Sequence, residues 1–208
     1  LPVSALAKAP LFLTAHPSVP ANTFAEFVAH VKAHPGTVNY ASSGIGSTHH
    51  LTAEAMSSAL GLKMVHVPFK GMGQAVPALV GGQVQVLFSA LPATVGFVKD
   101  NRLKLLIQNS SKRFSGAPTI PTLAESAIPG FDFAPTTLLM APSGTPAAVV
   151  RQLSADAAAA ARSPSVAETL LNSGVEVIGS SSEELAKVLQ DEAERFAKII
   201  KTINIKAD

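Results

Sequence analysis

The sequence repeats one local pattern three times: a short β-rich run, a turn with glycine or small hydroxyl side chains, and a stretch with helical periodicity. The three runs are residues 37–41, 63–67 and 84–89. Parallel strands need a crossover connection, which is usually a helix, so this repetition favours an α/β fold built from β-turn-helix units. We therefore predict a mostly parallel sheet in this part of the chain.

Further elements are expected on both sides of these units. A helix starting at Phe24 should have Asn22 or Thr23 as its N-cap, and a helix from about Thr48 should end at Gly61. From about residue 109 the chain is rich in Ser, Pro and Gly, and we interpret it as an ordered connection because apolar residues recur. The other predicted elements are strands at 11–15, 103–108, 136–141 and 175–178, and helices capped by Thr145, near 164–173, and capped by Ser181 with Glu184.

Composition excludes several classes of function. The 208 residues contain no cysteine, which excludes disulfides and thiolate chemistry. The formal net charge is +2 without a basic run, so neither nucleic acid nor an anionic membrane is an expected partner. No apolar block reaches the roughly 20 residues of a membrane helix. The first residues lack a signal-peptide pattern, which leaves a mature, a cytoplasmic or a shortened chain as alternatives.

The turn after residues 37–41 carries the strongest chemical signal. Glycines let the backbone approach a ligand closely, and the start of the following helix presents N–H groups that attract an anion. Small hydroxyls add donors without bulk, so the turn suits a carboxylate or a phosphate. Simple capping of the helix is the alternative explanation. The residues concerned are Ser42, Ser43, Gly44, Gly46, Ser47 and Thr48.

Other chemistry has little support in the sequence. His49 and His50 are adjacent, and neighbours on a helix point about 100° apart, so they are not expected to share a metal ion. The turn has neither the spacing of a nucleotide-binding motif nor that of a serine hydrolase, and no acid–base pair is visible. We predict no metal, no cofactor and no catalytic residue. Phe69 and Phe88 either wall a pocket or pack in the core.

Four motifs, in order along the chain, resemble a known family. They are PGTVNYASSGIGSTHHLTAEAM, HVPFKGMGQAVPALVGGQV, SSKRFSGAPTIPTLAESAIPGF and APSGTPAAVV. The chain resembles the substrate-binding proteins of tripartite tricarboxylate transporters, also called the Bug family of extracytoplasmic solute receptors. The resemblance runs from about Pro10 to the end of the chain.

The resemblance implies an α/β, periplasmic-binding-protein-like (type II) fold of two lobes, with mostly parallel sheets, that closes on a small organic acid. Residues 10–132 would form the second lobe with the Gly/Ser turn. Residues 133–208 would be the C-terminal part of a first lobe that is incomplete here. Such a protein is periplasmic, is not an enzyme, and delivers a carboxylate to the membrane subunits of a transporter. The signal peptide and the N-terminal region would lie outside this chain.

The resemblance also implies the ligand-binding residues. They include the turn from Ser42 to Thr48 and His50, which stands at the family's His-Leu position. Phe69 and Gly71 belong to a turn that corresponds to the family's PYKG, and Phe69 removes the hydroxyl of its tyrosine. Phe88 matches an aromatic residue at its strand end.

Two departures from the family pattern bear on these expectations. Thr136 and Leu138 stand where the family commonly has tryptophan and glycine, so ligand contacts from that strand stay open. An incomplete first lobe should expose apolar helix faces, and we expect self-association, segment swapping or a missing partner there. The alternative function is the effector-binding domain of a transcription regulator with the same two-lobed fold. A small α/β enzyme is the third interpretation.

Overall fold

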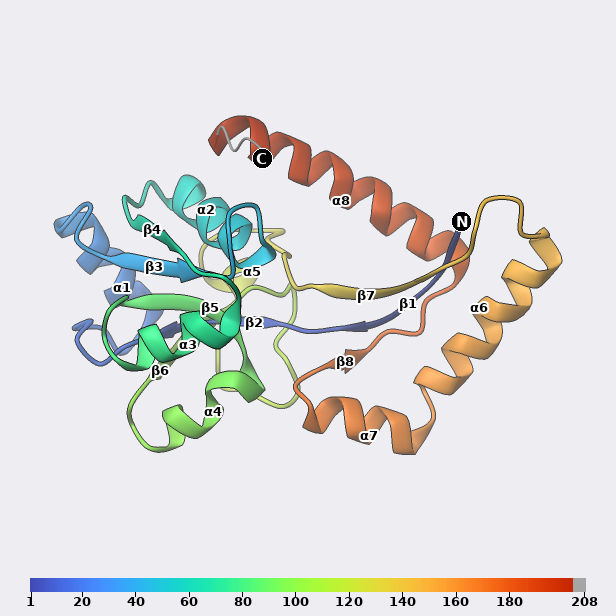
Figure 1. Ribbon diagram of the computed structural model, residues 1–208, viewed down its shortest axis with the longest axis horizontal. Coiled ribbons are helices and arrows are strands. Elements are labelled where there is room, and N and C mark those ends of the chain that lie inside the picture. Colours follow the sequence, from blue (N-terminus) through green and yellow to red (C-terminus); the bar gives the residue numbers. More distant parts are fainter. Residues whose placement is uncertain (204–208) are drawn as a thin grey trace. The chain divides into compact units, whose positions relative to one another are not determined.

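The computed structural model describes residues 1–203, without the side chains of residues 195, 198, 199, 202 and 203, and it divides into two compact units (Figure 1). Unit 1 comprises residues 1–9 and 134–199, and unit 2 comprises residues 10–133 and the chain from residue 200. Residues 204–208 of the predicted 133–208 domain lie outside the described residues. Within residues 1–203, no helix has the length and apolarity to cross a membrane.

Unit 2 contains a five-stranded sheet of order β4-β3-β5-β2-β6. β3 is parallel to both β4 and β5, whereas β2 is antiparallel to both β5 and β6, so β2 alone runs against the other four strands. The predicted α/β class is confirmed, but the sheet is mixed. The connection from β2 to β3 does not cross the sheet from one end of the strands to the other, so β3 runs in the direction opposite to β2. The strands are β2 Leu11–Ala15, β3 Asn39–Ser42, β4 Val65–Pro68, β5 Val86–Ala90 and β6 Lys104–Gln108.

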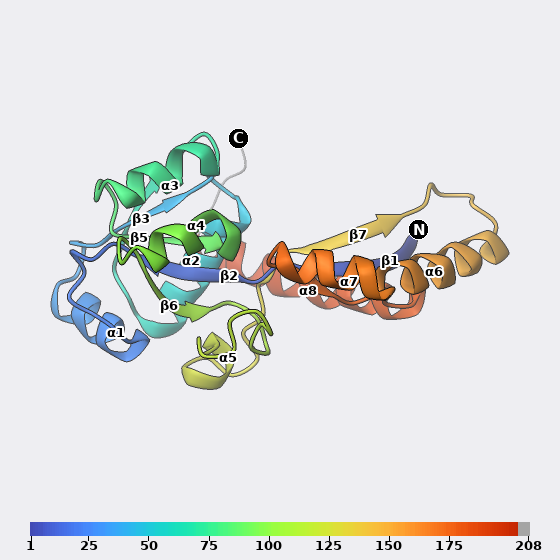
Figure 2. The same cartoon turned by 90° about the horizontal axis from the view of Figure 1, so that it is seen from below.

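Helices cover both faces of this sheet. Helix α2 (Thr48–Leu60) lies on one face, and α3 (Met72–Val80) and α4 (Leu91–Lys99) lie on the other (Figures 1 and 2). The Thr23 hydroxyl caps the first helix by accepting the N–H of Glu26 at 3.2 Å, and Gly61 ends the second with a φ of 64°, as predicted. The helices are α1 Phe24–Ala33, α2 Thr48–Leu60, α3 Met72–Val80, α4 Leu91–Lys99 and the short α5 Leu123–Ser126.

The inner strand β3, between β4 and β5, contributes side chains to both layers. Tyr40 stacks on His50 of α2, whereas Ala41 packs in a cluster with Ala75 and Leu79 of α3. A strand that is buried on both faces has a continuous apolar run rather than strict alternation. This explains the continuous apolar run of β5, whereas the edge strand β4 is only partly buried.

Asn109 joins the chain segment that enters unit 2 to the segment that leaves it. Its backbone N–H donates to the carbonyl of Leu11, and its own carbonyl accepts the N–H of Phe133, both at 2.9 Å. Its side-chain Oδ1 accepts the N–H of Leu11 at 2.8 Å, and its Nδ2 donates to the carbonyl of Phe133 at 2.9 Å. The side chain is fully buried. The residue therefore satisfies four backbone groups of two distant segments at once.

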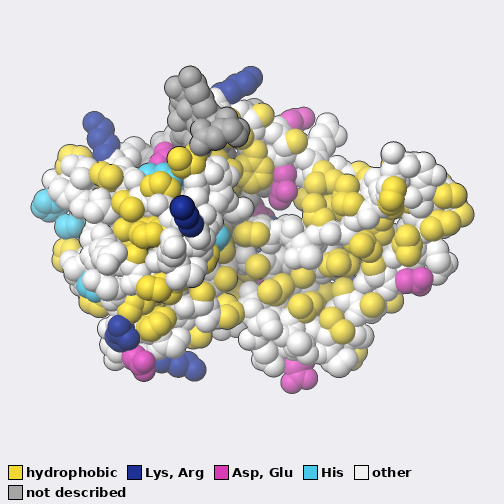
Figure 3. Space-filling model, viewed as in Figure 1, with side chains coloured by type: hydrophobic (Ala, Val, Ile, Leu, Met, Phe, Trp, Pro, Cys, Tyr) yellow, Lys and Arg dark blue, Asp and Glu magenta, His cyan; other side chains and the backbone are white. Residues whose placement is uncertain are grey.

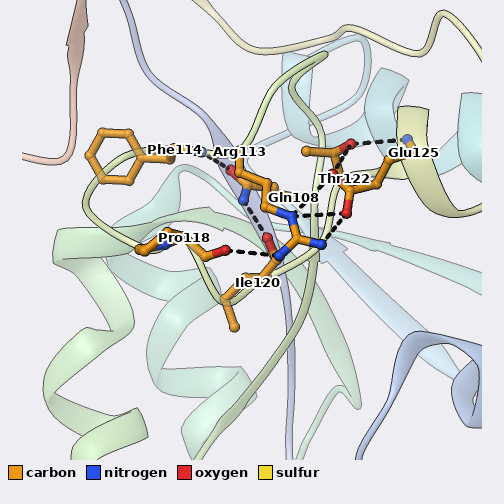
Figure 4. A network of polar contacts seen from close by, with 7 residues as sticks. All are labelled: Gln108, Arg113, Phe114, Pro118, Ile120, Thr122 and Glu125. Atoms are coloured by element: carbon orange, nitrogen blue, oxygen red, sulfur yellow. Dashed lines mark hydrogen bonds and ion pairs between the residues drawn. The ribbon is translucent and has the colours of Figure 1, made fainter.

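The connection after Asn109 is ordered by a polar network around Gln108 (Figure 4). Gln108 Oε1 accepts the N–H of Phe114 at 2.9 Å, and its Nε2 donates to the carbonyl of Ile120 at 2.7 Å. At the surface Arg113 forms an ion pair with Glu125 of α5, and its hydrogen bonds lower the pKa of that carboxyl. The prediction of an ordered connection rather than a free linker is confirmed.

Unit 1 is built on an antiparallel sheet of order β7-β1-β8. β1 was not predicted from the sequence, and the expectation of mostly parallel sheets is wrong for this unit. The physical reason lies in the connectivity: β1 leads the chain into unit 2 and β7 follows the return from it, so the two neighbours run in opposite directions. The strands are β1 Pro2–Lys8, β7 Thr136–Met140 and β8 Glu176–Val177.

Unit 1 also contains the helices α6 Ala147–Ala161 and α7 Pro164–Asn172, together with α8 Ser182–Ile203 up to residue 199. The predicted capping box of α8 is confirmed, because Ser181 Oγ accepts the N–H of Glu184 at 3.1 Å and the Glu184 carboxylate accepts the N–H of Ser181 at 2.7 Å. The predicted cap of α6 is wrong. Pro146 is the N-cap, and Thr145 instead donates its hydroxyl to the carbonyl of Pro142 at 2.9 Å, which closes the preceding turn.

Unit 1 leaves large apolar side chains at its surface. Figure 3 shows hydrophobic side chains spread over the side of the unit that carries β7, α6 and α7. Exposure of apolar helix faces was expected, and self-association through them stays a prediction. The exposed residues of this kind in unit 1 are Leu1, Met140, Val149, Leu153, Val166, Leu171 and Val188.

Candidate functional site

The carboxyl ends of β3, β4 and β5 lie at one edge of the unit 2 sheet, because these strands are parallel neighbours. We call this the ligand edge. A helix follows each strand closely: α2 begins at Thr48, α3 at Met72 and α4 at Leu91. Three helix N-termini, each with partial positive charge, are therefore close to this edge. The turns after the three strands therefore lie at the same edge of the sheet.

The β3–α2 turn, residues 43–47, needs glycine and caps a helix at the same time. Gly44 has a φ of 136° and Gly46 a φ of 75°, values that other residues rarely adopt. Ser47 is the N-cap of α2, and its hydroxyl accepts the N–H of His50 at 3.3 Å. The two explanations considered for this turn, capping and close approach to a ligand, are thus compatible.

The β4–α3 turn, residues 69–71, adjoins the β3–α2 turn. The N–H of Phe69 donates to the carbonyl of Ser42 at 3.1 Å. Gly71, the N-cap of α3, has a φ of 101° and makes no side-chain capping bond. The N–H of Lys70 instead donates to Gln74 Oε1 at 3.2 Å. The start of α3 therefore keeps backbone donors without a side-chain cap at the ligand edge.

A stack of three rings lies under the β3–α2 turn. The ring centroids of Tyr40 and His66 are 4.8 Å apart, and those of His66 and His50 are 3.9 Å apart with only 7° between their planes. We call these three residues the ring stack. The hydroxyl of Tyr40 donates to the carboxylate of Glu54 on α2, and burial together with this bond raises the pKa of Tyr40. The ring stack thus links β3, β4 and α2.

Hydrogen bonds connect the ring stack to the turn above it. Nδ1 of His50 accepts the N–H of Gly46 at 3.0 Å. Nε2 of His66 lies 2.7 Å from Oγ of Ser42. That hydroxyl also donates to the carbonyl of Gly44 at 3.0 Å and accepts its N–H at 3.2 Å. The conformation of the turn is therefore set from below by buried and half-buried side chains.

The imidazoles near the turn are in an environment that disfavours charge. Burial lowers the pKa of His49, whose Nδ1 lies 2.8 Å from Oγ of Ser43. Burial also lowers the pKa of His50, against the opposing effect of Glu54. The pKa of His66 is lowered to about 4 by burial and by the proximity of His50. In the part of the chain that the structure describes, no three His, Asp or Glu side chains are arranged to hold a metal ion.

The structure divides the predicted ligand-binding residues into two groups. Ser42, His50 and Phe88 are buried, with exposed fractions of 0%, 6% and 1%. Phe88 lies opposite Leu13 in the core, and the other two support the turn from below, so their contact with a ligand stays a prediction. The partly or fully accessible residues at the ligand edge are Ser43, Gly44, Gly46, Ser47, Thr48, Phe69 and Gly71.

Three members of this arrangement were not predicted from the sequence: Tyr40, His66 and Glu54. One signal could have found Glu54. His50 and Glu54 are four residues apart and so share one face of a helix. Tyr40 and His66 are direct partners in the parallel register of β3 and β4, but that register is not readable from the sequence.

The chain is similar to several known proteins. A family model described as "Tripartite tricarboxylate transporter family receptor" matches residues 1–205. A UPF0065 protein of Bordetella pertussis is 33% identical over 204 residues, which are 98% of this chain and 63% of that protein. Protein BugT of the same species is 30% identical over 99% of this chain and 63% of its own length. The chain thus spans about 63% of the length of these two relatives.

Solved structures show the same relationship. Rpa4515 of R. palustris with adipate has a TM-score of 0.84 and 29% identity, covering 98% of this chain and 68% of that one. MatC of Rhodopseudomonas palustris with bound malate has a TM-score of 0.78 and 30% identity, covering 96% and 69%. The periplasmic binding protein BugD has a TM-score of 0.81 and 26% identity, covering 100% and 70%. The predicted periplasmic-binding-protein-like fold is confirmed.

Proposed function

Because the chain belongs to the family of tripartite tricarboxylate transporter receptors, as its four motifs predicted, we propose that it captures a small organic acid for transport. The acid binds at the ligand edge and is passed to the membrane subunits of a transporter. The protein works in the periplasm and changes no covalent bond of its ligand. It uses no metal and no cofactor.

The observation that carries this proposal is the electrostatic character of the ligand edge. The N-termini of α2, α3 and α4 are close to it, and the turns offer backbone N–H groups together with small hydroxyls. The turns after the three strands contain one basic side chain, Lys70, and no acidic one. Such an environment stabilises a carboxylate and offers little to a neutral ligand. The adipate and malate of two similar structures are both small carboxylates.

The two units correspond, in this proposal, to parts of two lobes. Residues 10–132 are the second lobe, and residues 133–208 belong to the first lobe. Closure of the lobes on the acid shifts the population toward a closed state, and the transporter distinguishes that state from the open one.

Substitutions at Ser47 test the ligand edge without removing the cap of α2. Aspartate and asparagine both cap helices well, but only aspartate adds a negative charge beside the proposed acid. In the complete protein, calorimetric titration with malate, adipate and a tricarboxylate should show binding of at least one acid. Ser47→Asp should weaken that binding at least about tenfold, and Ser47→Asn should leave it nearly unchanged.

Thr23 provides a matched control. It is the N-cap of α1 and lies outside the turns of the ligand edge. Thr23→Asp should not change the affinity for the acid. If no acid binds to the unsubstituted protein, or if Ser47→Asp binds as tightly as Ser47→Asn, the proposed site is wrong.

A further inference from the structure

One buried histidine accepts a hydrogen bond from the backbone of the β3–α2 turn. His50 is nearly completely buried, and its Nδ1 accepts the N–H of Gly46 at 3.0 Å. A ring nitrogen that accepts a hydrogen bond carries no proton, so the neutral ring is protonated at Nε2. Gly46 has no side chain and a φ of 75°, and this bond is therefore a main restraint on its amide.

We propose that His50 is a positioning residue, which holds the β3–α2 turn in its binding conformation as a neutral acceptor, and that proton uptake by His50 releases the turn and weakens acid binding. The inference rests on the proposed function of the ligand edge. It adds a regulation of that site by pH.

The chemistry of imidazole explains why a proton would release the turn. Protonation places a hydrogen on Nδ1, so both ring nitrogens become donors. A donor at Nδ1 would then face the donor N–H of Gly46, and the hydrogen bond is lost. The Gly46 amide has to turn away, and it takes with it one of the backbone donors next to Ser47.

The groups around His50 keep the ring neutral near pH 7. His66 of β4 stacks on it at 3.9 Å, so a charge on one ring disfavours a charge on the other. Tyr40 of β3 is uncharged because burial and its bond to Glu54 raise its pKa. Glu54 of α2 is the opposing group, and it favours the charged ring. The neighbouring His49 is disfavoured from charging by burial, and β5 carries no titratable side chain.

The sign of the pH effect distinguishes this role from direct ligand contact. Because the pKa of His50 lies below its usual value of 6.5, acidification below about pH 6.5 progressively protonates it. Release of the turn then lowers acid affinity. If His50 instead contacted the carboxylate as a cation, the affinity would rise as the pH falls.

Nuclear magnetic resonance of the ¹⁵N-labelled complete protein tests the positioning role without any ligand. At pH 7 the His50 ring should show an unprotonated Nδ1. Between pH 7 and 4.5 the Gly46 amide resonance should move together with the His50 ring resonances, and its exchange with solvent should accelerate. A protonated Nδ1 at pH 7, or a Gly46 amide that ignores the titration of His50, would overturn the proposal.

A variant separates the acceptor from the titration. His50→Asn places an oxygen near the position of Nδ1 and cannot take up a proton. Its Gly46 amide should keep a constant resonance over the same pH range. His34→Asn, at an exposed position after α1, is the matched control. In this variant the Gly46 amide resonance should shift with pH as it does in the unsubstituted protein. If His50→Asn does not fold, the ring resonances of the unsubstituted protein still decide the question.

Binding of malate and adipate from pH 7 to 5 tests the regulatory part. Protonation of the acids themselves affects the unsubstituted protein and His50→Asn equally. The ratio of their association constants, unsubstituted protein over His50→Asn, therefore isolates the effect of protonating His50. This ratio should fall with falling pH, by at most about tenfold per pH unit for a single proton. A constant or rising ratio would contradict the regulation. If Gly46 titrates as expected but neither acid binds at any pH, the proposed function fails while the positioning role stands.

Discussion

Unit 2 and unit 1 bury their apolar residues very differently. Among the described side chains, the completely buried aromatic ones, such as Phe12, Phe27 and Phe88, all belong to unit 2. The buried apolar residues of unit 1 are mostly alanines, with Val3, Val150 and Leu185 as the larger ones. Unit 2 therefore has a core of its own between two layers of helices, whereas unit 1 offers much of its apolar surface to solvent.

The difference shows where the stability of the chain resides. Full burial of a large apolar side chain contributes roughly 1.5–3 kcal/mol, and unit 2 contains many such residues. A contiguous apolar surface on a folded protein typically marks contact with another segment or another chain. We therefore expect unit 2 to be the more stable unit and unit 1 to be the more sensitive to what covers it.

The largest effect is expected from truncating a core side chain of unit 2. Phe88→Ala should lower the free energy of unfolding of unit 2 by about 3–5 kcal/mol, because it leaves a cavity between the sheet and its helix layer. Leu153→Ala in α6, whose side chain is 42% exposed, is the counterpart in unit 1 and should change stability by no more than about 0.5 kcal/mol.

Hydrogen exchange followed by mass spectrometry measures the two units separately in increasing urea. A large loss of unfolding free energy in unit 1 on Leu153→Ala would show that the surface around this residue is covered. The proposed difference in apolar burial between the two units would then be wrong.

The next largest effect should come from Asn109, which has a smaller counterpart in unit 1. Asn109→Ala leaves the N–H of Leu11 and the carbonyl of Phe133 without their side-chain partner, at a cost of about 2–4 kcal/mol. In unit 1, Ser180 Oγ accepts the N–H of Ala5 at 2.8 Å, so Ser180→Ala orphans one group and should cost about 1–2 kcal/mol.

The same urea and exchange measurement compares these two variants. Equal losses of unfolding free energy for the two variants would contradict the prediction. The cost would then not follow the number of backbone groups left without a hydrogen-bond partner.

The smallest effect concerns the backbone at the ligand edge. Gly71 has a φ of 101°, and a Cβ there would meet open space, so Gly71→Ala should cost about 1–3 kcal/mol through backbone strain alone. Gly73 lies inside α3 in equally open space, so Gly73→Ala should be neutral or stabilise unit 2 by up to about 1 kcal/mol.

Thermal unfolding compares the two glycine variants, and malate titration adds a second measurement. Gly71→Ala should also weaken acid binding, because the start of α3 has to rearrange, whereas Gly73→Ala should not. A Gly71→Ala variant that is as stable as Gly73→Ala would show that the edge does not depend on this conformation.

The sequence was sufficient for most features that depend on nearby residues. The N-cap Thr23, the end of α2 at Gly61 and the capping box of Ser181 and Glu184 follow from local hydrogen bonding and backbone conformation. The Gly/Ser turn could also be located, because its residues act within one strand-turn-helix unit. The Thr145 cap was wrong because two short-range interactions compete there, and the preceding turn takes the hydroxyl.

Tertiary structure alone decided the antiparallel strand pairings and the contents of the ring stack. The antiparallel sheet of unit 1 joins β1 with strands more than a hundred residues away, a pairing that no local pattern encodes. Likewise, His66 meets Tyr40 and His50 only through the register of β3 and β4, and the burial of Ser42 and Phe88 depends on which face of the sheet each one takes. Local chemistry determines where an element begins and ends, whereas packing between distant segments determines which side chains meet.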